Sequence, residues 1–320
     1  MKISSILTRQ DYAKKISKKI FLRTFAYIVM FSLGFVFIYP VLYMLSTSFM
    51  GKTDLVSPYV VWIPYEFNVY NYYIAAIMVH FGDGLKSSII LAVFGSIGQT
   101  VSCAVIGYGF GRYKFWGKNI LFVLLLFTFI VPPEVIMIPL YIQFSRYRWI
   151  GTFLPLIVPA MVGQGVKGAI FVLIYRQFFS ALPWELDDSA RIDGLGGFGI
   201  FTRIMLPLSK AAIIVVFVFA FVWNWNEYYI PAIFLKPGDA PLSVRLSRLW
   251  SDIREYLAVK DTTGELVKDW ARNPYLIAIS NRSEAMGMAA CVLVIIIPCA
   301  LYVVMQRFFT ESVERTGLVE

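Results

Sequence analysis

The sequence predicts an all-α integral membrane protein with six transmembrane helices. Of its 320 residues, 58% are hydrophobic and 15% are charged, whereas a soluble globular domain is nearer half apolar and a quarter charged. The apolar residues gather in runs of about 20 residues, the length that crosses a bilayer as a helix. Aromatic residues make up 17% of the chain, which suits a protein with two lipid–water interfaces. This composition argues against a soluble cytosolic enzyme.

Each predicted span is an apolar run with few or no charges. The first run is predicted to be a retained span and not a cleavable signal peptide, because no small-residue cleavage site follows it. The third begins after Lys118 and reaches the Pro139 region, the fourth contains Lys167, and the fifth passes Glu227. The six runs are 25–45, 87–111, 119–139, 153–175, 211–235 and 285–306.

The charges outside the spans predict the orientation. The segment 1–23 carries seven basic residues and one acid, so the positive-inside rule places it in the cytoplasm. Six spans then return the tail, 311–320, to the same side. The long outer loop 236–284 is also basic, but long loops cross the membrane largely regardless of charge. The net charge of +9 therefore sets orientation and is no sign of nucleic-acid binding. With three cysteines and one histidine, a metal site is improbable.

The inner loop between the fourth and fifth spans, 182–210, carries the most specific pattern. Pro183 fits the first turn of a new helix, and acids at Glu185, Asp187 and Asp188 favour its N-terminal end. Glycines follow from Gly194 onward, and a second apolar and basic segment leads into the fifth span. We expect two short helices along the inner membrane face, where they either offer a contact to a soluble partner or simply cap the bundle.

This loop resembles the EAA loop of permease subunits in ATP-binding-cassette importers, in particular the maltose-type carbohydrate branch. The matching elements are Leu182-Pro183, Glu185-Leu186, Asp188-Ser189-Ala190, Ile192-Asp193-Gly194 and Leu206-Pro207. Asp188 stands where the family usually has Glu, and Ser189 where it has Ala. The six-span plan and the Trp225–Tyr228 step extend the resemblance, whereas 250–273 looks like an insertion.

The resemblance implies a permease domain, 24–310, in a bacterial cytoplasmic membrane. It implies four kinds of partner: a second permease, identical or related; two ATP-binding subunits; an extracytoplasmic solute-binding protein; and a sugar or oligosaccharide. ATP and Mg would be bound by the partner, since this chain has no phosphate-binding G-x-x-x-x-G-K-[ST] loop. The loop residues expected to couple to the ATPase are Glu185, Asp188, Ser189, Ala190, Asp193, Gly194 and Pro207.

Polar residues within the spans are candidates for a substrate pathway, because they are costly at membrane depth. Asn224, Trp225, Asn226, Glu227 and Tyr228 combine hydrogen-bonding groups with aromatic faces. They could line a sugar pathway, bond neighbouring helices or form an interfacial belt.

Two further charges in the spans also have alternative readings. Lys167, beside Gln164, either snorkels to the surface or faces a wet cavity and attracts an anionic sugar such as a uronate. Glu134 is a gate residue or a solvated acid at a helix end.

Two other functional classes are weaker. A polytopic membrane enzyme, such as a lipid-linked transferase, needs an acid and a base close together, yet Glu134, Lys167 and Glu227 lie in separate predicted spans. An ion-coupled carrier predicts repeated halves, and the sequence shows no internal repeat.

Overall fold

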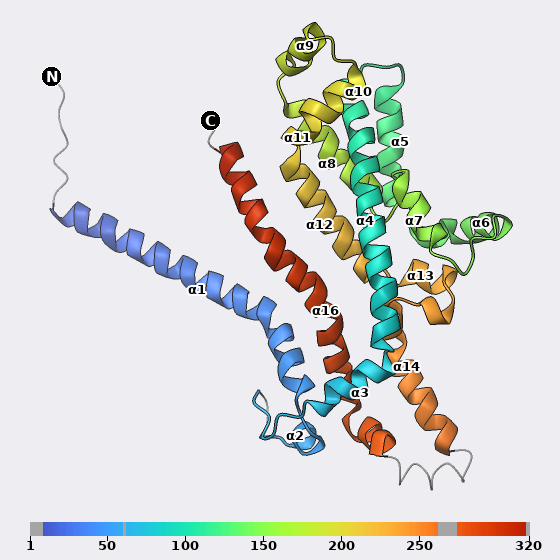
Figure 1. Cartoon of the computed structure of the whole chain (residues 1–320). Helices are drawn as coiled ribbons and strands as arrows, with labels where there is room; N and C mark the ends of the chain where they lie inside the picture. The colour runs from blue at the N-terminus through green and yellow to red at the C-terminus, as the bar shows by residue number, and fades with distance from the viewer. Residues whose placement is uncertain (1–8, 60–61, 262–273, 318–320) are drawn as a thin grey trace.

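The computed structural model describes residues 9–59, 62–261 and 274–317, and within these ranges all regular structure is helical (Figure 1). The predictions made for 1–8, 318–320 and the 262–273 part of the suspected insertion lie outside the described residues. The helices in chain order are α1 Arg9–Ser48, α2 Lys52–Val56, α3 Tyr70–Met78, α4 Phe81–Arg112, α5 Lys118–Ile130, α6 Pro133–Arg146, α7 Leu154–Met161, α8 Gly168–Ala181, α9 Glu185–Ile192, α10 Gly197–Ile200, the π-helix η1 Phe201–Met205, α11 Leu206–Leu208, α12 Lys210–Asn226, α13 Tyr229–Phe234, the short 3-10 helix η2 Pro237–Asp239, α14 Leu242–Asp261 and α16 Pro274–Gly317.

Helix α4 is the central element of the bundle. It packs against α7, α8, α12 and α14, and runs from the α14 end of the molecule to the α9 end (Figure 1). The contact with α8 is close because a side chain is missing from α4: a Cβ on Gly107 would lie 2.4 Å from the Tyr175 Cβ. Small residues allow such helix backbones to approach one another in a membrane. The apolar core at the α9 end gathers around Tyr175 and Phe179.

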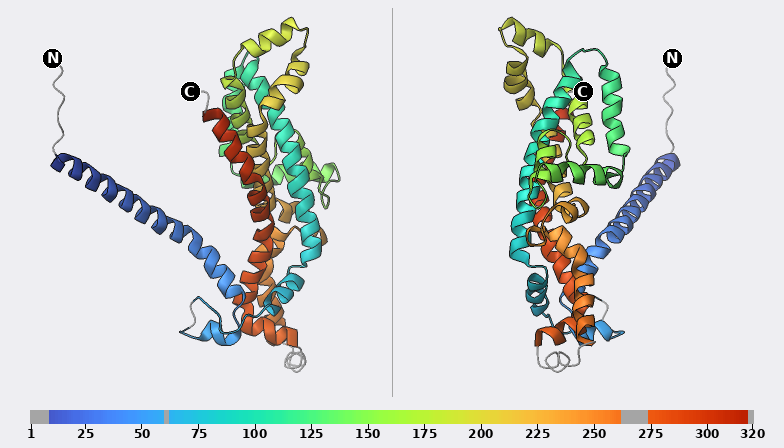
Figure 2. Two further views of the ribbon diagram at one scale, coloured as in Figure 1. Left: turned by 60° about the vertical axis from the view of Figure 1, so that its left-hand side comes forward. Right: turned by 90° about the vertical axis from the view of Figure 1, so that its right-hand side faces the viewer.

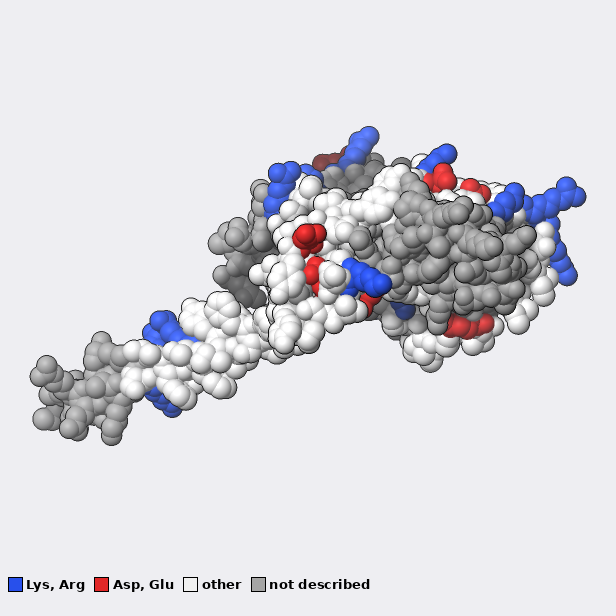
Figure 3. All heavy atoms as spheres, turned by 90° about the horizontal axis from the view of Figure 1, so that it is seen from below, with Lys and Arg blue, Asp and Glu red and all other residues white. Residues whose placement is uncertain are grey.

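Helix α1 stands apart from this bundle. Both views in Figure 2 show it leaning away from the other helices. It packs against α16, where the Tyr43 hydroxyl donates to Glu284 Oε1 at 3.0 Å. Seen from below, its described surface is mostly uncharged (Figure 3), and its apolar side chains are exposed along 20–42. This is the surface expected of a helix that contacts lipid or another subunit.

The helices support between three and five of the six predicted spans. Among the described residues, three are long and apolar enough to cross a membrane, namely Ser17–Ser48, Phe81–Arg112 and Glu284–Phe308. Two further candidates are pairs of helices bent by 97° at Lys118–Ile130 with Pro133–Arg146, and by 79° at Gly197–Leu208 with Lys210–Asn226. The remaining predicted span, the fourth (153–175), is divided between α7 and α8, so six spans with both termini on one side stays a prediction.

The expected third span, 119–139, is wrong as a continuous helix. Helix α5 ends at Ile130, and α6 starts at Pro133 in a different direction. The physical reason is the Pro132-Pro133 pair. Proline lacks the amide proton that a helix interior needs, and it pushes the residue before it to an extended conformation, as seen at Val131, with ψ 119°.

The expected fourth and fifth spans are also interrupted. Helix α7 ends at Met161 and α8 begins at Gly168. The break between them contains Gly163 and Lys167 at positive φ, 79° and 60°. Helix α12 ends at Asn226, because Glu227 is extended, with ψ 120°. Lys167 is therefore the N-cap of a helix and does not lie inside one.

Candidate functional site

Helix α9 forms where the sequence predicts the first short helix of the inner loop. Its first turn contains Glu185, Asp187 and Asp188, which interact favourably with the positive end of the helix dipole. It ends in a Schellman motif, in which the amides of Leu195 and Gly194 donate to Ala190 O and Arg191 O, each at 3.0 Å. Gly194 adopts φ 80°, so the Asp-Gly step of the motif ends the helix.

The position of α9 makes it accessible. It lies beyond the ends of α4 and α8, at one extremity of the bundle (Figure 1). Of the predicted coupling residues, Glu185, Asp188, Ser189, Asp193, Gly194 and Pro207 are exposed. Two apolar side chains beside them are exposed as well, Trp184 at 47% and Ile192 at 87%. Ala190 is 2% exposed and packs into the core of its own chain, so it supports α9 from beneath.

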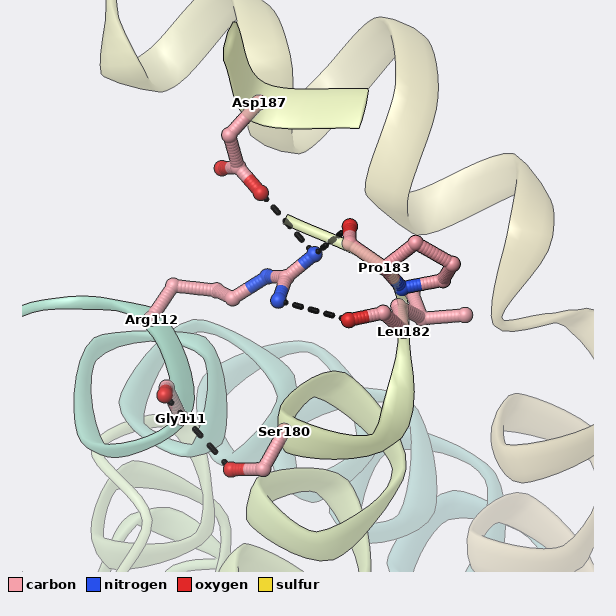
Figure 4. Close-up of polar contacts among 6 residues, drawn as sticks. All are labelled: Gly111, Arg112, Ser180, Leu182, Pro183 and Asp187. Carbon is pink, nitrogen blue, oxygen red and sulfur yellow. Dashed lines mark hydrogen bonds and ion pairs between the residues drawn. The ribbon is translucent and has the colours of Figure 1, made fainter. Parts of the chain in front are cut away.

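Arg112, the last residue of α4, holds α9 in place (Figure 4). Its Nη2 lies 2.9 Å from Asp187 Oδ2, and both side chains are nearly buried, at 2% and 3% exposure. Its Nη1 donates to Leu182 O at 2.9 Å, and its Nη2 donates to Pro183 O at 2.7 Å. The guanidinium also lies 4.5 Å from the centre of the Trp184 ring. We call this set of contacts the Arg112 anchor.

Sequence reasoning missed both charged residues of the Arg112 anchor. It treated Arg112 as an inner-loop charge and Asp187 as a helix-start acid. A usable signal was present, because Asp187 lies three residues before Ala190 and therefore on the same face of the helix. A face that must bury Ala190 must also bury Asp187, and a buried carboxylate needs a cation.

A second polar group fills the break between α7 and α8. Gln99 of α4 is fully buried; its Nε2 donates to Val166 O, and its Oε1 accepts from Asn224 Nδ2 at 3.2 Å. Ser102 Oγ donates to Ala160 O at 2.9 Å. These bonds supply partners to carbonyls that the interrupted helix leaves free, which a bilayer core requires.

Lys167 and Gln164 lie on this break, and both are exposed. The Lys167 Nζ is 4.9 Å from the centre of the Phe129 ring of α5. Among the described residues, the one ion pair is Arg112–Asp187, so Lys167 has no carboxylate partner there. Helix α8 has 14 residues, which places Lys167 about 21 Å from the α9 end of that helix.

In the predicted cluster at the end of α12, some side chains pack against other helices and others are exposed. Trp225 is 1% exposed and donates from Nε1 to Val294 O of α16 at 3.2 Å. Glu227 Oε1 accepts from the amides of Tyr229 and Ile230 at 3.0 and 3.2 Å, and so caps α13. Asn226 and Tyr228 are exposed. For Asn224 and Trp225, the contacts match the helix-bonding alternative.

Glu134 lies in the first turn of α6 and is exposed. It is not part of the Arg112 anchor, and it makes no ion pair with another described residue. Its position matches the solvated acid at a helix end.

Comparisons with known proteins agree on one family. A family model described as binding-protein-dependent transport system inner membrane component matches residues 103–315. The arabinooligosaccharides transport system permease protein AraQ of Halalkalibacterium halodurans is 29% identical over 65% of this chain and 74% of its own length. The polygalacturonan/rhamnogalacturonan transport system permease protein YtcP of Bacillus subtilis is 27% identical over 70% of this chain and 76% of its own.

A solved structure shares the fold. It is a bacterial ABC transporter involved in the import of the acidic polysaccharide alginate. The match has a TM-score of 0.65 and 18% identity, and it covers 96% of this chain and 100% of the other.

Proposed function

We propose a transport function for this chain, which belongs to the family of binding-protein-dependent transport system inner membrane components. In this proposal the chain is a permease subunit of an ATP-driven importer of sugars or oligosaccharides in a bacterial cytoplasmic membrane. It pairs with a second permease, two ATP-binding subunits and an extracytoplasmic solute-binding protein. The chain is not itself an enzyme, as for the permease proteins that it resembles.

The observation that carries the proposal is the exposed surface of α9. Four exposed polar side chains, Glu185, Asp188, Ser189 and Asp193, lie there beside the exposed apolar Ile192. A small apolar centre with a polar rim is the usual composition of a protein–protein interface. The ATP-binding subunits, which hold ATP and Mg, dock on this surface and pull α9 when they close on ATP.

Transport then follows alternating access of the helices joined to α9. The bent and interrupted helices around α4 provide the non-helical backbone that transporters place next to a substrate cavity. Gln99 and Asn224 hold that backbone together, while the exposed Gln164, Asn226 and Tyr228 are the groups left to contact a passing sugar.

The proposal extends to acidic oligosaccharides as substrates. Lys167 lies about 21 Å along α8 from its α9 end, which is within a bilayer core of about 30 Å. A charge at membrane depth is costly unless it meets water or an anion. The similarity to a polygalacturonan permease and to an alginate importer supports the same class.

The enzyme alternative lacks a pair of catalytic groups. Glu227 is occupied as the cap of α13, and Lys167 stacks on Phe129. Among the described residues, therefore, the three candidates do not form an acid–base pair.

Substitution of Asp188 by lysine tests the coupling role. The complex is reconstituted in vesicles, and ATP hydrolysis and sugar uptake are measured together. We expect Asp188→Lys to assemble but to lose most uptake per ATP hydrolysed, because a reversed charge at a docked surface is repelled by the partner. Glu134→Lys, which reverses the charge of an exposed acid in the first turn of α6, outside α9, is the matched control and should transport normally. Normal uptake by Asp188→Lys would show that α9 is not the docking surface.

A further inference from the structure

Helix α4 differs from its neighbours in continuity. The neighbouring helices α5, α7 and α12 each end within the bundle and are followed by a break. After α5 the direction also changes, by 97°. By contrast, α4 continues without interruption for 32 residues, about 48 Å. This uninterrupted helix contacts the loop before α9 at one end and the start of α14 at the other.

At its inner end, α4 is joined to α9 through the Arg112 anchor (Figure 4). The Arg112 guanidinium donates to the carbonyls of Leu182 and Pro183, which follow α8, and pairs with the Asp187 carboxylate of α9. Because the pair is nearly buried, movement of α9 away from α4 would leave an uncompensated charge out of water, which is strongly unfavourable. Helix α9 and the end of α4 therefore shift together.

At its other end, α4 is joined to α14. Ser88 Oγ of α4 accepts from the backbone amide of Leu242 at 2.8 Å, and both residues are buried. Gly84 allows the closest approach, since a Cβ there would lie 2.8 Å from Leu242 Cδ2 and 2.9 Å from Arg245 Cδ. Arg245 in turn donates to Ala240 O and Gly238 O, each at 2.7 Å, which fixes the turn that precedes α14.

We propose that Arg112 is a positioning residue that makes α9 and α4 move as one body, and that α4 carries this movement to α14 on the outer side. The inference rests on the proposed function, in which α9 faces the ATPase and α14 lies on the side of the binding protein. Ser88 and Arg112 are separated along α4 by about 36 Å, so one rigid element joins the two faces. Coupling of this kind is reciprocal: docking at the α14 side alters ATP hydrolysis, and ATP binding alters the α14 side.

The first test measures how strongly the solute-binding protein with sugar stimulates ATP hydrolysis by the reconstituted complex. Arg112→Lys keeps the charge but loses the planar fork that binds several acceptors at once. We expect it to reduce the stimulation at least fivefold. Arg146→Lys, an exposed arginine on α6, is the matched control and should retain it.

A double-mutant cycle that combines Arg112→Lys with a change at the contact between α4 and α14 tests whether α4 links α9 to α14. Ser88→Ala removes the hydrogen bond to α14 and should also lower the stimulation. If one element carries both effects, the double variant should be no worse than the more severe single variant. The proposal would be overturned if the two substitutions lowered the stimulation of ATP hydrolysis by factors that multiply in the double variant. Full stimulation in Arg112→Lys would overturn it as well. A wild-type complex that fails to import any sugar would instead overturn the proposed function.

A second measurement leaves Arg112 in place. After the native cysteines are replaced, spin labels at Ile192 on α9 and Ile97 on α4, both exposed, report the distance between these helices. The inference predicts the same distance distribution with and without ATP. A distribution that shifts with ATP would mean that α9 moves separately from α4, and the proposal would be wrong.

Discussion

Lys167 is the residue on which the proposal of acidic substrates depends. It is exposed at the break between α7 and α8, in a left-handed conformation that non-glycine residues seldom adopt. Its ammonium contacts the Phe129 ring, which is itself 43% exposed. A cation beside an exposed aromatic face matches a sugar ring that carries a carboxylate.

Replacement of Lys167 by methionine should discriminate between acidic and neutral sugars. Uptake of a uronic oligosaccharide should fall about tenfold or more, since a hydrogen bond to a charged group contributes about 1.5–3 kcal/mol. Uptake of a neutral oligosaccharide of equal length should be unchanged, and Lys167→Arg should retain much of the acidic uptake. If acidic uptake by Lys167→Met matched that of the wild type in vesicles, Lys167 would have no part in substrate recognition.

The types and spacing of residues predicted which acids of the candidate site are exposed, but not which polar residues pair with one another. Exposure of Glu185, Asp188 and Asp193 follows from charge and helical spacing, and the structure places them on the surface. Asp187 differs from Asp188 by one position, yet it is buried because the helix turns it toward Arg112. Asn224 was ambiguous in the sequence because its partner, Gln99, lies on a helix 125 residues away. Single-residue patterns do not contain such long-range pairs.

At the scale of secondary-structure elements, one glycine, Gly194, ends α9. Gly194 has φ 80°, a conformation that costs an L-residue about 1–2 kcal/mol. No atom lies near the position of a Cβ there, so any effect of a substitution comes from the backbone alone.

Gly194→Ala should therefore loosen the end of α9 without a steric clash. We expect the amides of Gly194 and Leu195, which close the helix, to exchange with deuterium about fivefold to thirtyfold faster, corresponding to about 1–2 kcal/mol. Gly196→Ala is the control, because Gly196 has φ −72° and free space around it. Equal protection in the two variants would argue against the Schellman motif.

The packing of α4 on α8 gives a second prediction about elements. A Cβ on Gly107 would meet Tyr175 Cβ at 2.4 Å and two backbone atoms of α8 at 3.1 Å, so the helices would have to separate. Gly107→Ala should destabilise the protein by about 1–3 kcal/mol, measured by thermal unfolding in detergent. Gly109→Ala, on the same helix with open space around it, should not destabilise. An unchanged unfolding temperature for Gly107→Ala would contradict this packing.

Element boundaries were the least predictable part of the fold. The Pro132-Pro133 pair is visible in the sequence, and its effect on the helix follows from backbone chemistry. The break at 162–167 has no proline to mark it, although Gly163 and Gly165 lie within it. It is stabilised by Gln99 and Ser102 from α4, which are tertiary contacts.

At the scale of the whole molecule, the two ends of the bundle have different chemistry. One end carries α9, with acids and apolar side chains exposed together. The other end carries α2, α3 and the start of α14, and includes the exposed Ile63. In the proposed transporter, these ends face different partners on opposite sides of a membrane. That arrangement, with six spans, was predicted from charge and hydropathy, and the helices support three to five spans.

The most direct test of the proposed coupling is a photo-crosslinking measurement at the two ends of the bundle. A photoreactive amino acid replaces Ile192 on α9, which is 87% exposed, or Ile63 at the opposite end, which is 75% exposed. Each variant is assembled with an affinity-tagged ATP-binding subunit and irradiated, and the products are identified by mass spectrometry. We expect a covalent product with the ATP-binding subunit from position 192 and none from position 63. An active complex in which position 192 yields no such product would contradict the claim that α9 couples this permease to its ATPase.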